Sequence, residues 1–313
     1  MKNASLLIHP EELSRKWIDR MAKHGIPTLG LHPVGGKTAD ESLRRLVDEQ
    51  VNDPAFRELL DYAHEKGLKI EYEIHAARYL LPASEFEKHP DWFRMTEDGE
   101  RTPDFNLCAS NEEALDYFAE QAAALAKKLY RSSDRYFLWL DDVKNSSCHC
   151  PQCQKLTPSD QQQIILNRMV QRMRKDNPNA TLAYLAYVDR IDPPTSVKPA
   201  EGIFLEYAPI ERNFHAPLDG STQSKPLEAL LSLFDVKSAK VLDYWYDNSL
   251  FSKWTKPPKP FAVDEPVLEA DFAFYRSLGF EDIGCFACYL GEDYEELHGD
   301  VDISAFGRVY RNG

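Results

Sequence analysis

The sequence predicts a single (β/α)8 TIM barrel spanning residues 1–313, with long loops at the carboxyl-terminal face of its strands. Eight short apolar segments recur along the chain, and each carries a polar or aromatic residue at or next to its end. Most gaps between them show the apolar spacing of amphipathic helices, so strands and helices alternate as in a closed parallel barrel of roughly 250 residues with additions. The expected strands are 5–9, 27–32, 68–75, 135–142, 181–188, 202–207, 239–247 and 282–289.

Helix signals support the assignment of the gaps. Ser110-Asn-Glu-Glu113 and Ser159-Asp-Gln-Gln162 match capping boxes, in which the first and fourth residues satisfy each other's backbone donors at a helix start. Residues 189–201 are short and proline-rich, so one barrel helix is expected to be missing there. Four longer connections should leave from the carboxyl ends of strands, where such loops build sites. They are residues 76–111, 143–158, 209–226 and 250–266.

Composition limits the partners. The chain has 51 acidic and 37 basic residues, and its formal charge of -14 disfavours a nucleic acid. It contains no run of about 18 apolar residues and no signal peptide. We therefore expect a cytoplasmic location and no association with a membrane. A small carbohydrate is the expected partner, and no pattern specifies an oligomeric state.

Acidic residues end several of the expected strands. Asp141 and Asp142 follow an apolar strand, and because side chains alternate, Asp142 is the expected general acid with Asp141 as its orienting neighbour. Glu206 or Asp243 would supply the nucleophile or base, since glycoside hydrolysis needs two carboxylates, about 5–5.5 Å apart for retention or about 6.5–9.5 Å apart for inversion. Alternatively, Asp141 or Asp142 caps the following loop.

Aromatic and basic side chains lie at the same strand ends. Rigid amphipathic rings suit sugars, which have apolar faces and polar edges. The histidines could hydrogen-bond substrate hydroxyls, and an arginine could pair with an acidic sugar. Alternatively, the aromatics fill the barrel as good strand formers and the histidines are structural. The candidate substrate-binding residues are His32, His75, Arg78, Tyr187, Tyr207, Trp245, Tyr246 and Tyr289.

The six cysteines are unevenly placed and do not form a secreted disulfide framework. Cys148, Cys150 and Cys153 form a cluster with the spacing of metal ligands, and Cys108 or His149 could be the fourth ligand. A structural zinc ion there would brace the loop that follows Asp142. Reduced thiols buried under that loop are the alternative.

Four stretches between residues 74 and 153 carry a family resemblance. They are Ile74-His-Ala-Ala-Arg-Tyr-Leu-Leu-Pro82, Lys88-His-Pro-Asp-Trp-Phe93, Asn106-Leu-Cys-Ala-Ser-Asn111 and the cysteine cluster. Together they resemble an uncharacterised bacterial barrel domain associated with carbohydrate-degrading proteins, which is distantly similar to α-glucuronidases and β-N-acetylhexosaminidases. The resemblance is specific from about His75 to Tyr187 and implies a glycosidase-like barrel with its acid at Asp141 and Asp142. Hexosaminidase-type enzymes carry Asp-Glu at that place, whereas this chain has Asp-Asp.

These features favour a glycoside hydrolase that cleaves a small oligosaccharide or glycoside, with a uronic acid or an N-acetylated sugar among its candidate substrates, and that needs no cofactor for catalysis. A second hypothesis is a catalytically silent barrel that binds a carbohydrate. A third is a metal-dependent isomerase or hydrolase whose metal would be held by His32, His75 and carboxylates.

Overall fold

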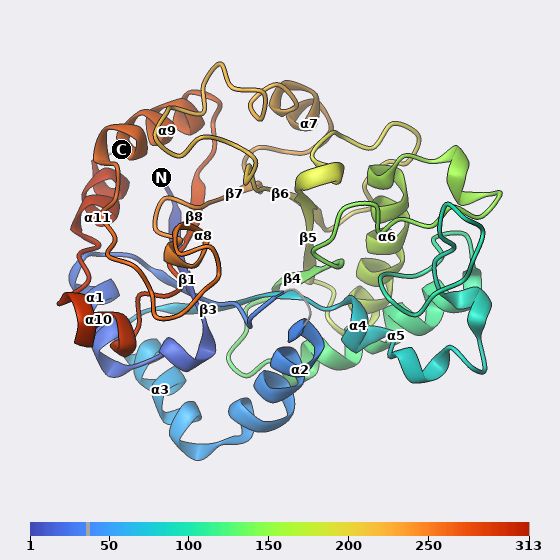
Figure 1. Ribbon diagram of the computed structural model, residues 1–313, viewed down its shortest axis with the longest axis horizontal. Helices are drawn as coiled ribbons and strands as arrows, with labels where there is room; N and C mark the ends of the chain where they lie inside the picture. The colour runs from blue at the N-terminus through green and yellow to red at the C-terminus, as the bar shows by residue number, and fades with distance from the viewer. Residues whose placement is uncertain (36–37, 313) are drawn as a thin grey trace.

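The computed structural model describes residues 1–35 and 38–312 and contains a closed barrel of eight parallel strands (Figure 1). The predicted (β/α)8 fold is confirmed. The strands follow one another around the ring in chain order, and the last pairs with the first. They are β1 (Asn3–Ile8), β2 (Thr28–Leu31), β3 (Lys69–His75), β4 (Arg135–Trp139), β5 (Thr181–Ala186), β6 (Ile203–Tyr207), β7 (Lys240–Asp243) and β8 (Asp282–Phe286).

Helices surround this ring (Figure 1). The α-helices are α1 (Arg15–Lys23), α2 (Ala39–Arg44), α3 (Pro54–Glu65), α4 (Ala77–Leu80), α5 (Glu112–Lys128), α6 (Pro158–Asp176), α7 (Leu227–Leu233), α8 (Asn248–Phe251), α9 (Glu265–Ser277), α10 (Glu292–His298) and α11 (Ser304–Arg311). Shorter turns of helix are η1 (Pro10–Glu12), η3 (Arg45–Glu49), η4 (Gln50–Asn52), η5 (Ala83–Glu85), η6 (Pro90–Trp92), η7 (Cys153–Lys155) and η8 (Val188–Arg190). Between β5 and β6 the chain forms only η8, so the expected loss of one barrel helix is confirmed. Among the described helices, none combines the length and the apolar character that a membrane crossing requires.

Two helices begin near, but not at, the predicted capping residues. The cap of α5 is Asn111, whose side chain accepts from the backbone N–H of Ala114 at 2.9 Å. The cap of α6 is Thr157, which forms a reciprocal capping box with Asp160. Pro158 can occupy the first turn because no partner is needed there for a backbone N–H. The predictions of Ser110 and Ser159 as caps are therefore wrong by one and two residues.

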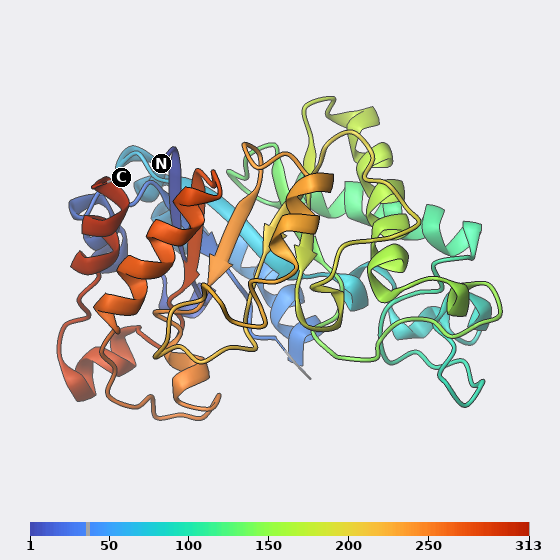
Figure 2. The ribbon, with the colours of Figure 1, turned by 90° about the horizontal axis from the view of Figure 1, so that it is seen from above.

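The strands point toward one edge of the molecule, and the long loops leave from that edge (Figure 2). The connections after β3, β4, β6 and β7 all begin at carboxyl ends of strands, as predicted. Most apolar side chains lie between the strands and the surrounding helices, whereas a smaller apolar cluster, which includes Leu7, Phe137 and Leu242, fills the inside of the ring.

A buried charged cluster lies among the residues inside the ring. Lys240 is fully buried, and its Nζ lies 3.0 Å from Glu71 Oε2 and contacts Glu73. Glu206 is 3.9 Å away. Gly284 leaves room for this lysine, because a Cβ there would lie 2.9 Å from Lys240 Cε and 2.5 Å from a neighbouring hydroxyl oxygen. Lys240 offsets part of the carboxylate charge, and burial raises the pKa of the Glu73 and Glu206 carboxyls, which lowers the cost of enclosing them.

Candidate active site

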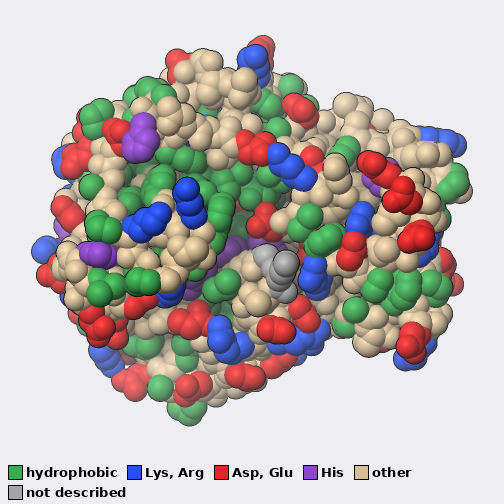
Figure 3. Space-filling view, viewed as in Figure 1, with side chains coloured by type: hydrophobic (Ala, Val, Ile, Leu, Met, Phe, Trp, Pro, Cys, Tyr) green, Lys and Arg blue, Asp and Glu red, His purple; other side chains and the backbone are tan. Residues whose placement is uncertain are grey.

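A cavity of about 370 Å³ opens at the carboxyl ends of the strands. Figure 3 shows this face of the molecule hollowed at the barrel mouth, with hydrophobic and histidine side chains visible inside the hollow. Its lining comes from strand ends and from the loops that follow them. The lining residues are His9, His32, Val34, Gly35, His75, Trp139, Asp142, Leu185, Tyr187, Ile210, Leu242, Tyr244, Asp247, Ser249, Trp254, Phe286 and Tyr289.

Three histidines at the ends of β1, β2 and β3 form one wall of the cavity. Each Nδ1 is within hydrogen-bond distance of a backbone carbonyl oxygen. His9 Nδ1 is 2.7 Å from the oxygen of His32, His32 Nδ1 is 2.8 Å from that of Glu73, and His75 Nδ1 is 2.7 Å from that of Leu140. A carbonyl only accepts, so each Nδ1 carries the proton and each Nε2 is left as an acceptor when the ring is neutral. Burial lowers the pKa of His9 and, more strongly, that of His32, which keeps both neutral.

The structure adds His9 to the predicted pair of His32 and His75. The sequence carried a signal for it, because the first apolar segment ends on His9 as the next two end on His32 and His75. The ring centroids of His9 and His32 are 6.1 Å apart, and those of His32 and His75 are 5.8 Å apart.

Two carboxylates reach the cavity, Asp142 from the end of β4 and Asp247 from the loop after β7. Asp142 is exposed, and its carboxylate adds to burial in raising the pKa of the nearby Tyr187 hydroxyl. Asp247 is only 5% exposed, and burial raises its pKa to about 6. Asp247 Oδ1 accepts from Ser249 N at 3.1 Å and Ser249 Oγ at 2.6 Å, whereas Oδ2 has no protein donor among the described residues. The sequence carried a signal here too, because the predicted strand 239–247 ends on Asp247.

Asp141 lies behind this wall and does not line the cavity. Its Oδ2 accepts from Asn106 N at 2.7 Å, and its backbone N–H donates to Asn106 Oδ1 at 3.0 Å. Its carbonyl accepts from Arg190 at 3.0 Å, and burial raises the pKa of its side chain. Arg78 is 3.7 Å from Asp141 and lies over the ring of Phe105, so the structure places this arginine behind the wall too rather than in the cavity.

The structure corrects the expected positions of Glu206 and Asp243. Side chains inside the ring come from alternate residues of each strand. Glu206 does point inside, but it lies below the cavity floor, where it accepts from Trp139 Nε1 at 2.7 Å and burial raises its pKa well above the usual range. Asp243 has the opposite parity and points outward, accepting from the Tyr275 hydroxyl at 2.7 Å and pairing with Arg212 at 3.3 Å. Neither carboxylate lines the cavity.

Three predicted aromatic residues also lie outside the site. Tyr207 donates its hydroxyl to the backbone of Gln223, and Trp245 Nε1 donates to Asp271 at 2.8 Å. Tyr246 packs against Phe261 and Phe306. For these three residues, the alternative that they are structural aromatics describes the observed packing, whereas Tyr187 and Tyr289 do line the cavity.

Further aromatic residues of the cavity were not predicted. They are Trp139, Tyr244, Phe286 and Trp254. Tyr244 and Phe286 are stacked with centroids 5.1 Å apart. Trp254 is 64% exposed at the lip, in a loop without periodicity that the sequence could use to place it. Its φ is 53°, and that of Tyr289 is 63°, both in the left-handed region that is unfavourable for bulky residues. Such strain collects at ligand-binding sites, where the surrounding structure holds it.

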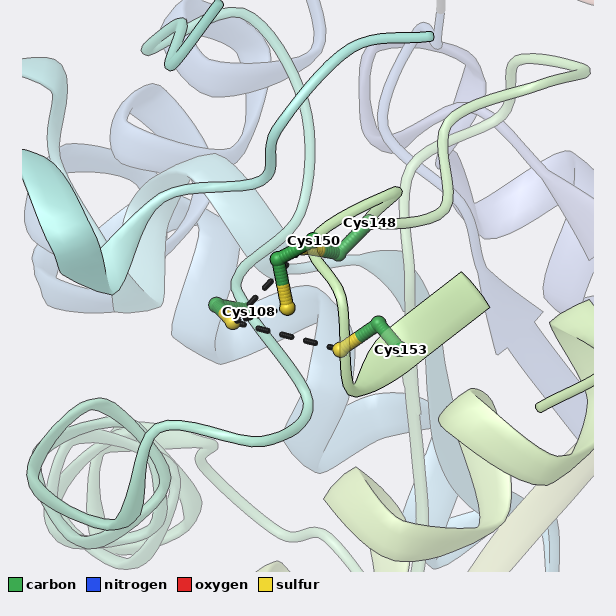
Figure 4. Close-up of side chains that lie close together, drawn as sticks. All are labelled: Cys108, Cys148, Cys150 and Cys153. Carbon is green, nitrogen blue, oxygen red and sulfur yellow. Dashed lines mark hydrogen bonds between the residues drawn. The ribbon is translucent and has the colours of Figure 1, made fainter. Parts of the chain in front are cut away.

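The four cysteines Cys108, Cys148, Cys150 and Cys153 lie outside the cavity and converge on one point (Figure 4). Cys108 comes from the loop after β3 and the other three from the loop after β4. All four are buried, and their sulfur atoms lie within 4.8 Å of one another. His149, the other candidate for a fourth ligand, points elsewhere, with Nε2 3.9 Å from Glu97. Elsewhere among the described residues, no three potential metal ligands gather in this way.

The fold and site together define a (β/α)8 barrel with carboxylates, histidines and aromatic rings around one opening at the carboxyl ends of its strands. The chain belongs to the family described as a domain of unknown function, DUF4838, which matches residues 39–277. The predicted relationship to an uncharacterised glycosidase-like family is confirmed. No curated protein matches the sequence.

Several solved glycoside hydrolases share the fold. A β-galactosidase from Rahnella sp. R3 has a TM-score of 0.58 at 12% identity, over 99% of this chain and 55% of that one. The GH36 α-galactosidase AgaA from Geobacillus stearothermophilus has a TM-score of 0.57 at 11% identity, over 100% of this chain and 41% of that one. The GH20 catalytic modules of the pneumococcal exo-β-D-N-acetylglucosaminidase StrH give a TM-score of 0.50 at 11% identity, over 99% of this chain and 83% of that one. The chain thus spans about half the length of the two galactosidases.

Proposed function

We propose that the chain is a glycoside hydrolase that binds a small carbohydrate in the barrel mouth and uses Asp142 and Asp247 as its carboxylate pair. The observation that carries the proposal is that two carboxylates in different environments face one aromatic-lined cavity. Glycosidic hydrolysis requires one carboxyl that gives a proton and one carboxylate that attacks or activates water. The similarity to solved glycoside hydrolases supports the fold on which this chemistry would take place.

The environments assign the roles. Burial raises the pKa of Asp247 to about 6, so it holds a proton near neutral pH for part of the time and suits the general acid. Asp142 is exposed and lines the cavity, so its carboxylate can reach a sugar or a water molecule there, which suits the base or nucleophile. This proposal moves the acid from Asp142 to Asp247. Asp141 would act as a positioning residue through its two bonds to Asn106.

The lining favours a neutral sugar. It contains no lysine or arginine among the described residues, and Arg78, the candidate partner for an acidic sugar, contacts Asp141 instead. Three histidine acceptors suit sugar hydroxyl donors, and exposed Trp254 can stack on the apolar face of a ring. The cavity size falls in the range of about 300–1,000 Å³ that is typical of small-ligand sites.

A silent carbohydrate-binding barrel is the second candidate. The observation that favours it is the use of Asp247 Oδ1 as a helix cap, which needs no catalytic role. For the third hypothesis, a metal at the mouth, the described residues offer no gathered set of histidine and carboxylate ligands. We therefore do not propose it.

The test is a turnover screen of the purified chain on aryl glycosides of neutral and acidic sugars, read beside thermal shifts with the free sugars. We expect hydrolysis of a neutral glycoside that is lost in the Asp142→Asn, Asp247→Asn double variant and retained in Asp219→Asn, an exposed acid outside the cavity. A thermal shift without turnover would favour the silent barrel. If no sugar were hydrolysed and no sugar produced a thermal shift, both carbohydrate proposals would be wrong.

A further inference from the structure

We propose that Cys108, Cys148, Cys150 and Cys153 bind one structural zinc ion that joins the loop after β3 to the loop after β4. These cysteines lie outside the cavity, so the inference is independent of the reaction carried out there. Figure 4 shows the four side chains turned toward a common centre from two separate segments of chain.

The sulfur positions have the dimensions of a tetrahedral thiolate site. Cys108 Sγ lies 3.6 Å from Cys148 Sγ, 3.7 Å from Cys150 Sγ and 3.9 Å from Cys153 Sγ. With Zn–S bonds of about 2.3 Å, a tetrahedron places its sulfur atoms about 3.8 Å apart. A disulfide would need a sulfur separation of about 2.05 Å. The observed spacing therefore fits four ligands of one ion.

The surroundings supply the outer interactions that such a centre needs. Four thiolates around Zn²⁺ carry a net charge of about -2, which donors must offset in a buried position. The backbone N–H of Met95 donates to Cys148 Sγ at 3.3 Å, and Ser110 Oγ lies 3.3 Å from both Cys108 Sγ and Cys150 Sγ. The guanidinium of Arg101 lies 3.8 Å from Cys148 Sγ and supplies a positive charge.

The cluster is connected to the wall of the cavity by short stretches of chain. Asn106 lies two residues before Cys108, and Ser146 lies two residues before Cys148. Asn106 Nδ2 donates to Ser146 Oγ at 2.9 Å, and Asn106 bonds Asp141 at 2.7 and 3.0 Å. The φ of Asn106 is 39°, a strained value that a fixed loop can maintain. The ion would thus hold the segment that presents Asp142.

The first experiment measures metal by mass spectrometry in the native chain, purified from cells without added metal or chelator. We expect about one zinc per chain. Cys108→Ser and Cys153→Ser should lose it, and Cys285→Ser should retain it, because Cys285 lies in β8 away from the cluster. Cys150→His should also retain zinc, because three cysteines and one histidine form a common zinc site.

The second experiment separates a metal from other uses of the cysteines. Cobalt substituted into the native chain should give the visible absorption of a tetrahedral thiolate site. Removing zinc from the native chain should raise hydrogen exchange in residues 93–108 and 146–157 more than in the strands. Six free thiols without metal, a disulfide within the cluster, or iron in place of zinc would each overturn the proposal. These outcomes are measured on the native chain, so a variant that fails to fold does not affect them.

Discussion

The barrel interior holds its polar groups in two layers, and the two layers differ in what their groups can reach. In the lower layer, Glu71, Glu73 and Glu206 surround Lys240, and all of them are buried. In the upper layer, the strand-end histidines lie with Asp142 and Asp247 around an open cavity. The paired charges of the lower layer are enclosed and stabilise the fold, whereas groups left with a free acceptor at an opening can bind and react.

The largest effect should come from removing a carboxylate of the upper layer. Asp142→Asn should lower hydrolysis of the glycoside identified by the screen by about 10²–10⁴-fold, the usual contribution of an acid or base. Glu206→Gln should leave it within a few-fold, because Glu206 does not line the cavity, and because burial raises the pKa of its carboxyl, which makes a neutral amide a close substitute. The measurement is kcat/KM for both variants. Equal losses would contradict the division into two layers.

Removing the cation of the lower layer should reduce the stability of the fold. Lys240→Met leaves buried carboxylates without their cation, and breaking a buried pair typically costs about 3–5 kcal/mol. Urea unfolding at pH 7 measures this loss. Lys237→Met is the matched control, because Lys237 is exposed and pairs with Glu281 at 3.0 Å on the surface. Its loss should stay within about 1 kcal/mol. A native-like stability of Lys240→Met would show that the buried charges are not needed.

The contrast between layers also marks how far the sequence could predict the site. Apolar segments and their ends placed the strands, and with them His32, His75, Asp142 and Tyr187. The ends of the segments did not show whether a side chain points into the barrel or outward, or in which layer of the barrel it lies. Glu206 and Asp243 both look like strand-end carboxylates in the sequence, yet one lies a layer too low and the other points outward.

Loop residues escaped prediction for a different reason. The loop around Trp254 has no periodicity, and its path over the cavity depends on contacts between distant segments, such as Asn248 Nδ2 to the carbonyl of Tyr289 at 3.3 Å. The fourth cysteine ligand was similarly undecided, because the spacing of 148–153 gives three sulfur atoms and only the packing of two loops brings Cys108 to them. Local patterns therefore predicted the frame of the site, and tertiary contacts completed it.

A smaller effect should appear in the pH dependence of stability. Burial raises the pKa of Asp247 from 3.8 to about 6, so between these values the folded chain binds a proton that the unfolded chain releases. Stability therefore falls as the pH rises through this window, and the penalty is complete above it. Asp247→Asn removes the penalty and keeps an oxygen for the cap. Relative to the native chain, its unfolding free energy should increase by about 2 kcal/mol from pH 4 to pH 7.

Chemical denaturation at several pH values measures this difference, with Asp219→Asn as the exposed control. The control should follow the native curve at a constant offset. A constant offset for Asp247→Asn as well would mean that the Asp247 carboxyl titrates normally. It would then lose its assignment as the acid of the upper layer.

The smallest effect should come from the lip of the cavity. Trp254 is 64% exposed and packs little against the core, so Trp254→Ala should leave the unfolding free energy nearly unchanged. Loss of a ring that stacks on the sugar should weaken binding by about tenfold, or roughly 1.4 kcal/mol, and should raise KM with little change in kcat. Leu297→Ala is the control, because Leu297 is 57% exposed outside the cavity lining. If the two variants had the same KM, the strained lip would not form part of the sugar site.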